Sequence, residues 1–269
     1  METRILEGVA DVLRMAAATV VMPRFAALQP GDIEMKSVNE PVTIADREAE
    51  AIIGRALLSL VPHARIVGEE ACAADPALVE HLGEGTVWII DPIDGTANFA
   101  AGRAPFAMMV ALLSNGETIG SWILDPLSDR LAVAERGSGA WIDGQRIHAS
   151  ASPLNLESLC GIVSEAFLPA EQRGLIDHLR ESVGNVYPTA RCAGHEYPLV
   201  ASGGRHFTLY WRTLVWDHAP GALLLTEAGG SVTHLDGALY RPAYPRSGLL
   251  LAHNPLISKA LLSLIGRRD

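Results

Sequence analysis

One short stretch constrains this chain more than any other: residues 88–99, which read WIIDPIDGTANF. The apolar run that ends at Ile90 predicts a buried strand, and two carboxylates, Asp91 and Asp94, follow it directly. Pro92 stands between them, has no N–H and fixes its own φ, and it biases the preceding residue toward extended backbone. We therefore expect this turn to hold its shape before any ligand binds.

Gly95 and Thr96, the next two residues, indicate what the carboxylates are for. Glycine lets the backbone approach a ligand closely, and Thr96 can begin a helix whose free N–H groups favour an anion. Negatively charged carboxylates can lie beside an anion-binding turn if a divalent metal ion lies between the protein and a phosphate group. The working hypothesis is a metal-dependent phosphate site.

The bulk composition limits the possible classes of protein. A chain of 269 residues is one large domain or two closely packed halves. Its net charge of −10 argues against broad binding to a nucleic-acid backbone, although bound metal can reverse the local sign for a phosphate substrate. Neither lysine follows glycine, which excludes a P-loop.

The cysteines and apolar runs indicate the compartment. Three widely spaced cysteines without a C-x-x-C pair fit a reducing cytoplasm and offer no zinc framework. No run approaches the length of a membrane span, and the first residues do not read as a signal peptide. We expect a cytoplasmic protein that does not bind membranes.

The first part of the chain predicts helices flanking a sheet. Helical spacing runs over residues 3–22 and is expected to end at Pro23, an irregular or hairpin-like segment covers 32–42, and a second helix covers 45–60. Asp46 lies at the start of that second helix, where a negative charge is favourable. A short strand at 65–67 precedes Glu69 and Glu70. If this strand neighbours the one before Asp91, several carboxylates meet at one sheet edge, which is unfavourable unless cations or protons neutralise them.

The remaining pattern suggests two halves. Residues 106–147 read as an antiparallel meander with hairpin signals such as Asn115-Gly116 and Asp143-Gly144. The polar residues 149–158 are the candidate boundary. Strands and helices then alternate: strands near 159–163, 185–186 and 206–211, and helices within 170–183, around 195–202, up to about 228, and from Asn254 and Pro255 to the end. We predict an N-terminal α+β half (1–150) that carries most metal ligands and a C-terminal α/β half (151–269) that carries Asp217 and the specificity segment.

Four segments, in order, resemble the signatures of one family: Pro41-Val42-Thr43-x-x-Asp46, Gly68-Glu69-Glu70, Asp91-Pro92-Ile93-Asp94-Gly95-Thr96 and Trp216-Asp217. They look like those of the inositol monophosphatase family, magnesium-dependent and lithium-sensitive phosphomonoesterases, and the resemblance covers nearly the whole chain. It implies an α/β (α+β) fold, a layered α-β-α-β-α sandwich of the inositol monophosphatase/fructose-1,6-bisphosphatase type. It also implies a site between the two halves and, commonly, a homodimer.

The resemblance also implies roles for individual residues. One Mg²⁺ would be held by Glu69, Asp91 and the carbonyl of Ile93, and a second by Asp91, Asp94 and Asp217, with a third, weaker ion also near Glu69. Thr96 with Asp46 would orient the attacking water and accept its proton, with help from Glu69. The phosphate would rest on the N–H groups of Gly95 and Thr96. Lys36 would close over the metals, and Glu70 and Trp216 would support the site.

Substrate choice is where the resemblance is weakest. Members acting on inositol phosphates have a glutamate seven residues before the aspartate of the Trp-Asp motif, and this chain has Tyr210 there. The family's Gly-Ser/Thr-Ala-Ala segment is Arg191-Cys192-Ala193-Gly194. Losing an acceptor for sugar hydroxyls should discriminate strongly, so we hypothesise that myo-inositol 1-phosphate is a poor substrate. The residues expected to line the substrate pocket are Asp94, Gly95, Thr96, Cys192, Ala193, Tyr210 and Asp217.

Several alternatives stay open at this point. A histidinol-phosphate phosphatase is suggested by residues 41–46, whereas Ala97-Asn98-Phe99 looks closer to the inositol branch; an adenosine 3′,5′-bisphosphate phosphatase belongs to the same superfamily. A non-catalytic regulatory protein on the same fold would predict a damaged ligand set, and none is seen in the sequence. His218 is expected at the pocket mouth or in the core, because neighbours on a helix point apart. His195 and Tyr197 are candidate pocket residues.

Overall fold

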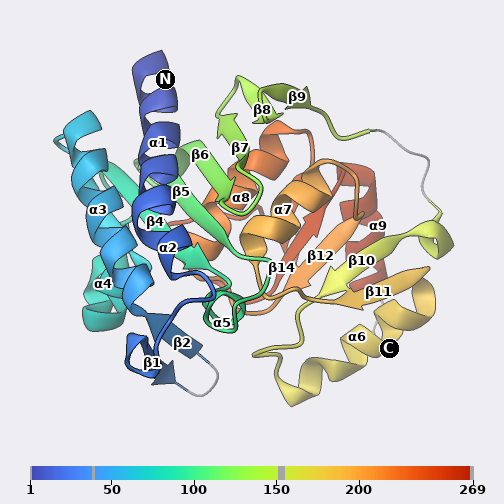
Figure 1. Cartoon of the computed structure of the whole chain (residues 1–269). Coiled ribbons are helices and arrows are strands. Elements are labelled where there is room, and N and C mark those ends of the chain that lie inside the picture. The colour runs from blue at the N-terminus through green and yellow to red at the C-terminus, as the bar shows by residue number, and fades with distance from the viewer. Residues whose placement is uncertain (1, 38–39, 151–154, 267–269) are drawn as a thin grey trace.

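The computed structural model describes residues 2–37, 40–150 and 155–266, which form five layers (Figure 1). Helices α1 and α3 cover one face of a seven-stranded sheet. Helices α7 and α8 separate that sheet from a five-stranded one, whose outer face is covered by α6 and α9. The α-β-α-β-α sandwich is therefore confirmed. The longer helices are α1 (Thr3–Ala16), α3 (Ile44–Leu60), α6 (Arg173–Ser182), α7 (Ala193–Ala201), α8 (Val215–Glu227) and α9 (Pro255–Ile265).

The N-terminal helix extends slightly further than its sequence suggests. After α1 a π-helical turn (Ala17–Val21) leads into α2 (Met22–Arg24), so the helical path passes Pro23 instead of ending there. A wider turn just before a proline accommodates the ring and the missing N–H. The predicted hairpin follows as the antiparallel strands β1 (Ile33–Ser37) and β2 (Glu40–Thr43). Thr43 then caps α3, as the sequence spacing to Asp46 allows.

The seven-stranded sheet contains the predicted meander. Its order is β3-β4-β5-β6-β7-β8-β9, with β3 parallel to β4 and every other pair antiparallel. Asn115 and Gly116 both have positive φ, 48° and 82°, which a tight hairpin between twisted strands requires. The strands are β3 (Arg65–Gly68), β4 (Thr86–Asp94), β5 (Ala107–Ser114), β6 (Glu117–Asp125), β7 (Arg130–Glu135), β8 (Gly139–Ile142) and β9 (Gln145–Ile147).

Strand β4 differs from the prediction at the point that matters most. It does not stop at Ile90 but continues through Asp94, and its pairing with β5 becomes irregular between Asp91 and Asp94. Pro92 lies inside this irregularity and has no N–H for the ladder, which is why the pairing bulges there and resumes beyond it. The two carboxylates are thus fixed by a sheet, more firmly than by a free turn.

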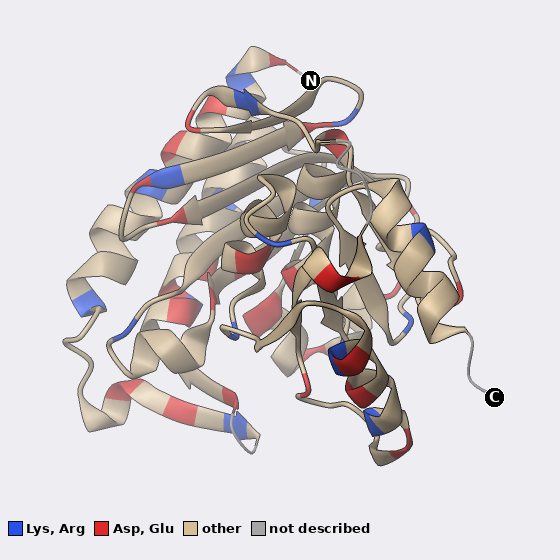
Figure 2. Cartoon of the chain, turned by 90° about the vertical axis from the view of Figure 1, so that its right-hand side faces the viewer, with Lys and Arg blue, Asp and Glu red and all other residues tan. Residues whose placement is uncertain are grey.

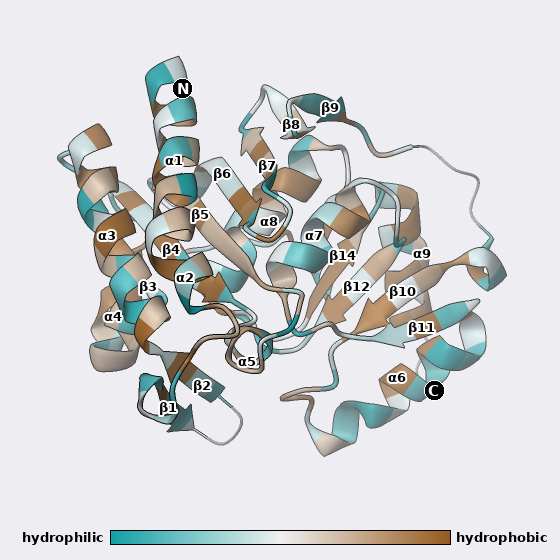
Figure 3. Cartoon of the chain, viewed as in Figure 1, coloured by the Kyte–Doolittle hydropathy of each residue, from teal (hydrophilic) through white to brown (hydrophobic). Residues whose placement is uncertain are grey.

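The five-stranded sheet has the order β11-β10-β12-β14-β13, in which β10 pairs parallel with both β11 and β12. The sequence did not indicate β13 or β14, which add an antiparallel edge. Figure 3 shows hydrophobic residues along the central strands, with hydrophilic ones on the outer helices α1 and α6. The strands are β10 (Cys160–Val163), β11 (Asn185–Pro188), β12 (Phe207–Tyr210), β13 (Ser231–His234) and β14 (Leu249–Ala252). Short helices are α4 (Glu69–Ala74), α5 (Thr96–Ala100) and 3₁₀ turns at Pro30–Asp32, Pro76–Val79, Leu156–Ser158 and Ala170–Gln172.

Helix α8 ties the two sheets together. The Ser121 hydroxyl of β6 donates to the carbonyl of Pro220 in α8 at 2.7 Å, and the Glu227 carboxylate accepts the N–H groups of Gly137 and Gly139. The first sheet comes from residues 65–147 and the second from 160–252. We propose the boundary at 149–158 on that basis; residues 151–154 of it lie outside the described part. Within the described residues, no helix has the length and apolar character needed to cross a membrane.

Two helical glycines provide a matched test of this packing. A Cβ on Gly221 of α8 would lie 2.1 Å from the ring of Tyr197 in α7, whereas a Cβ on Gly54 of α3 meets nothing closer than 3.8 Å. Gly221→Ala should therefore destabilise the protein by about 1–3 kcal/mol. Gly54→Ala should stabilise it by about 0.5–1 kcal/mol, because alanine is the better helix former. Urea denaturation of both variants measures this, and equal effects of the same sign would contradict the packing described.

Candidate active site

A cavity of about 800 Å³ lies where the two halves meet, and it is lined by the end of β4, α4, the β1–β2 hairpin, α8 and three loops of the second half. Figure 2 shows acidic positions of several separate elements near the middle of the molecule. The residues given a role by the family resemblance all line this cavity except Asp46 and Glu70. Those two lie just behind it, in contact with Thr96 and Lys36 respectively.

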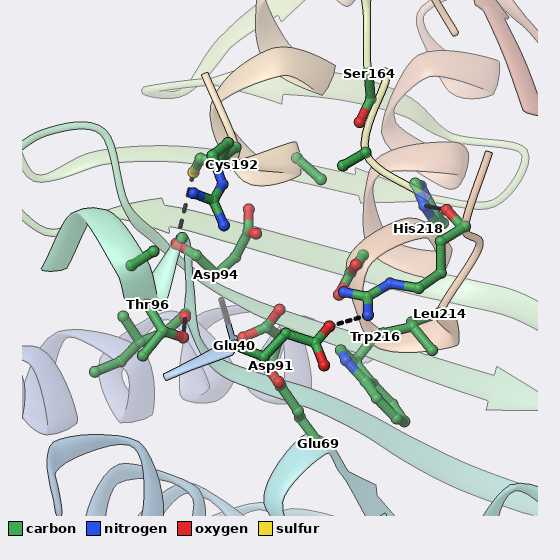
Figure 4. Close-up of a pocket in the computed structure, with 18 of the residues that line it drawn as sticks. Glu40, Glu69, Asp91, Asp94, Thr96, Ser164, Cys192, Leu214, Trp216 and His218 are labelled. Carbon is green, nitrogen blue, oxygen red and sulfur yellow. Dashed lines mark hydrogen bonds and ion pairs between the residues drawn. The ribbon is translucent and has the colours of Figure 1, made fainter. Parts of the chain in front are cut away.

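Four carboxylates line one part of this cavity and define the acidic group: Glu69, Asp91, Asp94 and Asp217. They come from α4, β4 and α8, and Figure 4 shows Glu69, Asp91 and Asp94 on the cavity wall. The sequence left open whether β3 and β4 are neighbours; they pair in parallel, and this pairing brings Glu69 beside Asp91. Burial, followed by the negative charges of Glu69, Asp94 and Asp217, raises the pKa of Asp91 well above its usual range.

Asp91 is the most deeply buried member of the acidic group. It is 1% exposed, and its Oδ1 has no hydrogen-bond partner in the described part of the chain. The pKa of Asp217 is likewise raised, first by burial and then by Asp94 and Glu69, with Arg212 and Lys36 opposing. Buried carboxylates that repel one another, one of which has an oxygen without a donor in the described part of the chain, form an oxygen-rich set suited to hard divalent cations. The residues present therefore fit Mg²⁺.

These side chains are not arranged as a closed ion cage. Among the described residues, no three His, Cys, Asp or Glu side chains already stand in a metal-binding cluster. The Lys36 ammonium contacts Glu69 at 3.0 Å and Glu70 at 2.6 Å. Burial alone would lower the pKa of Lys36, but attraction by Glu69 and Glu70 outweighs it and the pKa is raised. A cation of the protein itself thus neutralises this edge of the acidic group.

Asp94 links the acidic group to the segment expected to set specificity. Its Oδ2 accepts the N–H of Gly194 at 2.6 Å, and its backbone carbonyl faces the Cys192 thiol at 3.6 Å. Burial raises the pKa of Asp94 to about 7, although the Gly194 N–H and the Cys192 contact oppose the shift. Cys192 and Ala193 line the cavity, as the sequence predicted for substrate-binding residues.

Thr96 and Asp46, the expected proton relay, lie in contact. The Thr96 hydroxyl is 3.2 Å from Asp46 Oδ1 and 2.9 Å from the carbonyl of Ile93. Asp46 Oδ2 accepts the backbone N–H and the hydroxyl of Thr43, so the aspartate also caps α3. Burial raises the pKa of Asp46 to about 7, against the lowering effect of the Thr43 hydrogen bonds. One carboxylate thus serves helix capping and contacts the cavity-lining threonine.

Gly95 precedes the short helix α5 in the left-handed conformation, with φ +87°. A Cβ there would lie 3.1 Å from the Pro105 carbonyl and 3.3 Å from that of Arg191. Only glycine fits this combination of φ and close backbone approach. The backbone at Gly95 and Thr96 is therefore held in one conformation on the cavity wall.

The wall near Tyr210 is built in a way that the sequence did not reveal. Tyr210 lines the cavity, but its hydroxyl donates to Glu196, which is completely buried. Glu196 also accepts the Thr189 hydroxyl at 2.7 Å and the Ala190 N–H at 2.6 Å. Burial raises the pKa of Glu196, while these donors oppose the shift. A carboxylate stands next to the expected position, but its hydrogen bonds are used inside the protein.

The three expectations on aromatic and histidine residues have different outcomes. His218 is 1% exposed and lies in the cavity wall, where its Nδ1 is 3.1 Å from the Tyr197 hydroxyl and its Nε2 3.1 Å from the Arg212 carbonyl. Its burial is confirmed, and burial lowers its pKa to about 4. The expectation that Tyr197 and His195 line the pocket is wrong. Tyr197 is fully buried in the core, and the exposed His195 lines a separate cavity of about 30 Å³.

Several cavity-lining residues had no role in the sequence-based expectations, among them Glu40, Phe167 and Arg212, and Arg191 entered them only as the first residue of the segment 191–194. Arg212 forms an ion pair with Glu40 of β2, marked by a dashed line in Figure 4, and its guanidinium lies 3.9 Å from the Phe167 ring centroid. They lie in loops or at strand ends, where hydrophobic periodicity carries no signal. An arginine five residues before Asp217 was the one available hint.

Comparison with known proteins agrees with this architecture. The fold is that of solved inositol monophosphatase structures: the Thermotoga maritima enzyme has a TM-score of 0.81 at 27% identity, covering 97% of this chain and 96% of that one. The extragenic suppressor protein suhB from Bartonella henselae has a TM-score of 0.82 at 26% identity, covering 99% and 100%.

Sequence comparison gives the family. The inositol monophosphatase family profile matches residues 3–267. An inositol-1-monophosphatase of Rhizobium meliloti is 31% identical over 90% of this chain and 89% of its own length. A Nus factor SuhB of Pseudomonas aeruginosa is 30% identical over 93% and 92%. The chain belongs to the inositol monophosphatase family.

The raised pKa values predict how stability depends on pH. Asp46 and Asp94 titrate near 7 in the folded chain, against an ordinary value of 3.8, so their contribution is complete below 3.8 and is lost as the pH rises through 7. The Tm measured in a chelator should therefore fall between pH 6.5 and 8. Titration of His218 has the opposite effect on stability, but it acts below this range, because burial lowers the pKa of His218 from 6.5 to about 4. Added Mg²⁺ should raise Tm, and more so at pH 8. A chelator profile that rises with pH, or no response to Mg²⁺, would contradict the acidic group described.

Proposed function

We propose that the protein is a Mg²⁺-dependent phosphomonoesterase that hydrolyses a small phosphate ester by in-line attack of water. The observation that carries this proposal is the acidic group, in which a buried carboxylate oxygen at the edge of a large cavity has no donor among the residues that the structure describes. Membership of the inositol monophosphatase family supports it. Two Mg²⁺ ions, with a weaker third, follow from the resemblance.

The chain's own residues divide the work. Glu69, Asp91 and the Ile93 carbonyl would hold one ion, and Asp91, Asp94 and Asp217 the other. Bound Mg²⁺ would supply polarisation of the phosphate and acidification of water. The Gly95 and Thr96 N–H groups would hold phosphate oxygens, as N–H groups at a helix start can.

Thr96 and Asp46 position the water in this proposal. With its proton directed at Asp46 Oδ1, the Thr96 hydroxyl presents oxygen lone pairs that can accept a hydrogen bond from the attacking water. A carboxyl with a pKa of about 7 is well matched to exchange a proton at neutral pH. Glu69 completes the proposed catalytic set, and Lys36 and Glu70 support it from the rim.

Lithium sensitivity and a homodimer follow from the resemblance, and a cytoplasmic location follows from the cysteine usage and apolar runs of the sequence; all three remain part of the proposal. The expected partner is a small phosphate ester, with no role for nucleic acid or membrane.

Phosphate release tests the proposal directly. Wild-type protein should release phosphate from p-nitrophenyl phosphate or a sugar phosphate in Mg²⁺ and not in a chelator. Asp94→Asn should abolish turnover by removing a ligand, while Tm stays equal or rises slightly because repulsion in the acidic group falls. Asp177→Asn, the same change at an exposed position of α6, is the control and should behave as wild type. Global unfolding of Asp94→Asn alongside its loss of activity would count against the assignment.

The wall at Tyr210 predicts the ranking of substrates. Because the Tyr210 hydroxyl donates into Glu196, that carboxylate is not free to accept sugar hydroxyls. The kcat/KM for myo-inositol 1-phosphate should lie below that for other phosphomonoesters, measured against histidinol phosphate, fructose 1,6-bisphosphate and adenosine 3′,5′-bisphosphate. The inositol ester ranking first would refute this, whereas a clear preference for histidinol phosphate or the adenosine compound would identify one of the alternative superfamily activities.

A regulatory role on the same fold is the second candidate, because similar relatives carry the name Nus factor SuhB. It makes the opposite prediction in the same assay: Mg²⁺ would raise Tm, yet no ester of the panel would be hydrolysed. The complete set of acidic residues at the cavity favours the enzyme.

A further inference from the structure

Part of the cavity wall has a different chemistry from the acidic group. Arg191 and Arg212 line it together with Phe167 and Tyr210, and we call these four residues the basic wall. Three separate segments of the second half supply them: the loop after β10, the loop between β11 and α7, and the end of β12 with the residues that follow it. Two guanidinium groups on one cavity wall are suited to an anion.

Arg212 is held in place from both ends. Its carbonyl lies 3.1 Å from Nε2 of the buried His218, and its guanidinium stacks 3.9 Å from the Phe167 ring centroid. Phe167 has φ +64° and a side chain that is 55% exposed. A bulky residue in the left-handed region at the mouth of a cavity is unusual and indicates a constraint that the fold maintains. The stacked guanidinium is pre-oriented, so less freedom is lost when it binds.

The ion pair of Arg212 leaves donors available. Within the described chain, Nη1 is the one guanidinium nitrogen of Arg212 in a hydrogen bond, and its partner is Glu40. Both side chains are accessible at the cavity mouth, at 38% and 30%. Such an exposed pair contributes little and is readily exchanged for a better acceptor. A planar fork with free N–H groups matches a carboxylate or phosphate.

The backbone that carries Arg191 is fixed by the buried Glu196. Glu196 accepts the Thr189 hydroxyl and the Ala190 N–H, the Thr189 hydroxyl in turn accepts the Arg191 N–H at 2.9 Å, and Asn98 donates to the Ala190 carbonyl. Arg191 has φ +59° within this network. The carboxylate of Glu196 therefore builds the wall instead of binding a substrate hydroxyl.

We propose, on the basis of the phosphatase function above, that the basic wall makes the enzyme selective for esters that carry a second anionic group, with Arg212 as the specificity-determining residue. The group cleaved lies at the acidic group, and the second anion, a carboxylate or another phosphate, replaces Glu40 as the partner of Arg212. Glu40 competes with that anion when the site is free of substrate.

Two pairs of esters that differ in one charged group test this. In one pair glycerol 2-phosphate is compared with 2-phosphoglycerate, in which a carboxylate replaces one hydroxymethyl group. In the other, inositol 1-phosphate is compared with inositol 1,4-bisphosphate. Wild type should prefer the more anionic member of at least one pair by about tenfold or more in kcat/KM. The pair that responds shows whether the second group is a carboxylate or a phosphate.

The variants separate recognition from a structural role. Arg212→Gln should reduce the preference about tenfold, mainly through KM, and Arg212→Lys should retain part of it. Glu40→Gln should increase the preference about two- to fivefold by removing the competitor. If the ion pair between Arg212 and Glu40 had only a structural role, Arg212→Gln and Glu40→Gln would each change kcat/KM for both members of a pair by the same factor. Arg146→Gln removes an arginine near Trp141, away from the cavity, and should match wild type.

Isothermal titration calorimetry of the same esters on Asp94→Asn in Mg²⁺, the variant expected to fold without turnover, gives the binding preference separately from hydrolysis. If the esters bind selectively but none is hydrolysed, the proposed phosphatase function is contradicted and the role of the basic wall is not. Hydrolysis without preference for either anionic member, or a preference that survives Arg212→Gln, would overturn the role of the basic wall. If Arg212→Gln does not fold, the direction of change in Glu40→Gln decides, since a decrease or no change contradicts the proposal.

Discussion

The mutual repulsion of carboxylates at the end of β4 is the constraint on which the site depends. Placing an ion in a protein interior costs several kcal/mol even after relaxation, whereas a whole domain is stable by about 5–15 kcal/mol. Asp91 and Asp94 are buried and Asp217 and Glu69 lie beside them, so the group cannot carry its full charge without cations or protons. The raised pKa values of Asp91, Asp94 and Asp217 express this, and the contact of Lys36 with Glu69 relieves one side of it.

The fold holds these charges by distributing them over rigid elements. Asp91 and Asp94 lie in a strand bonded to a neighbour on each side, and the bulge at Pro92 sets the spacing between them. Asp217 comes from the first turn of α8, which is buried between the two sheets. Neither half of the chain contains the complete acidic group. Packing of α8 against the first sheet is therefore also what assembles the site.

Much of this could be predicted because the signals are local. The hairpin turns, the acidic residue Asp46 at the start of α3 and the short strand before Glu69 each follow from a few neighbouring residues, and the pairing of β3 with β4 fulfils the condition on which the convergence of carboxylates depended. The failures have physical reasons. The continuation of β4 depends on pairing with β5, and β13 and β14 depend on a sheet edge that no periodicity reveals.

The basic wall and the buried Glu196 that supports it could not be predicted, because their roles come from contacts between distant parts of the sequence. Glu196 reads as a polar residue on a helix, and only the folded chain shows it enclosed by donors from Thr189, Ala190 and Tyr210. Likewise, Arg212 and Glu40 are 172 residues apart in the sequence. Local patterns identify residues whose backbone geometry is special, such as Gly95, and they miss side chains whose role comes from long-range contacts.

This difference reflects how the cavity is built. The acidic group is fixed to a strand and to helices, where small displacements cost packing energy, whereas Phe167, Arg191 and Arg212 lie on loops. Hydrogen bonds to the buried Glu196 hold residues 189 and 190, whereas Asp94 contacts the residues that follow through the Gly194 N–H and the Cys192 thiol. The residues proposed to hold metal and the residues proposed to set selectivity thus lie on different elements. The wall that contacts the substrate can therefore change while the proposed metal ligands stay in place.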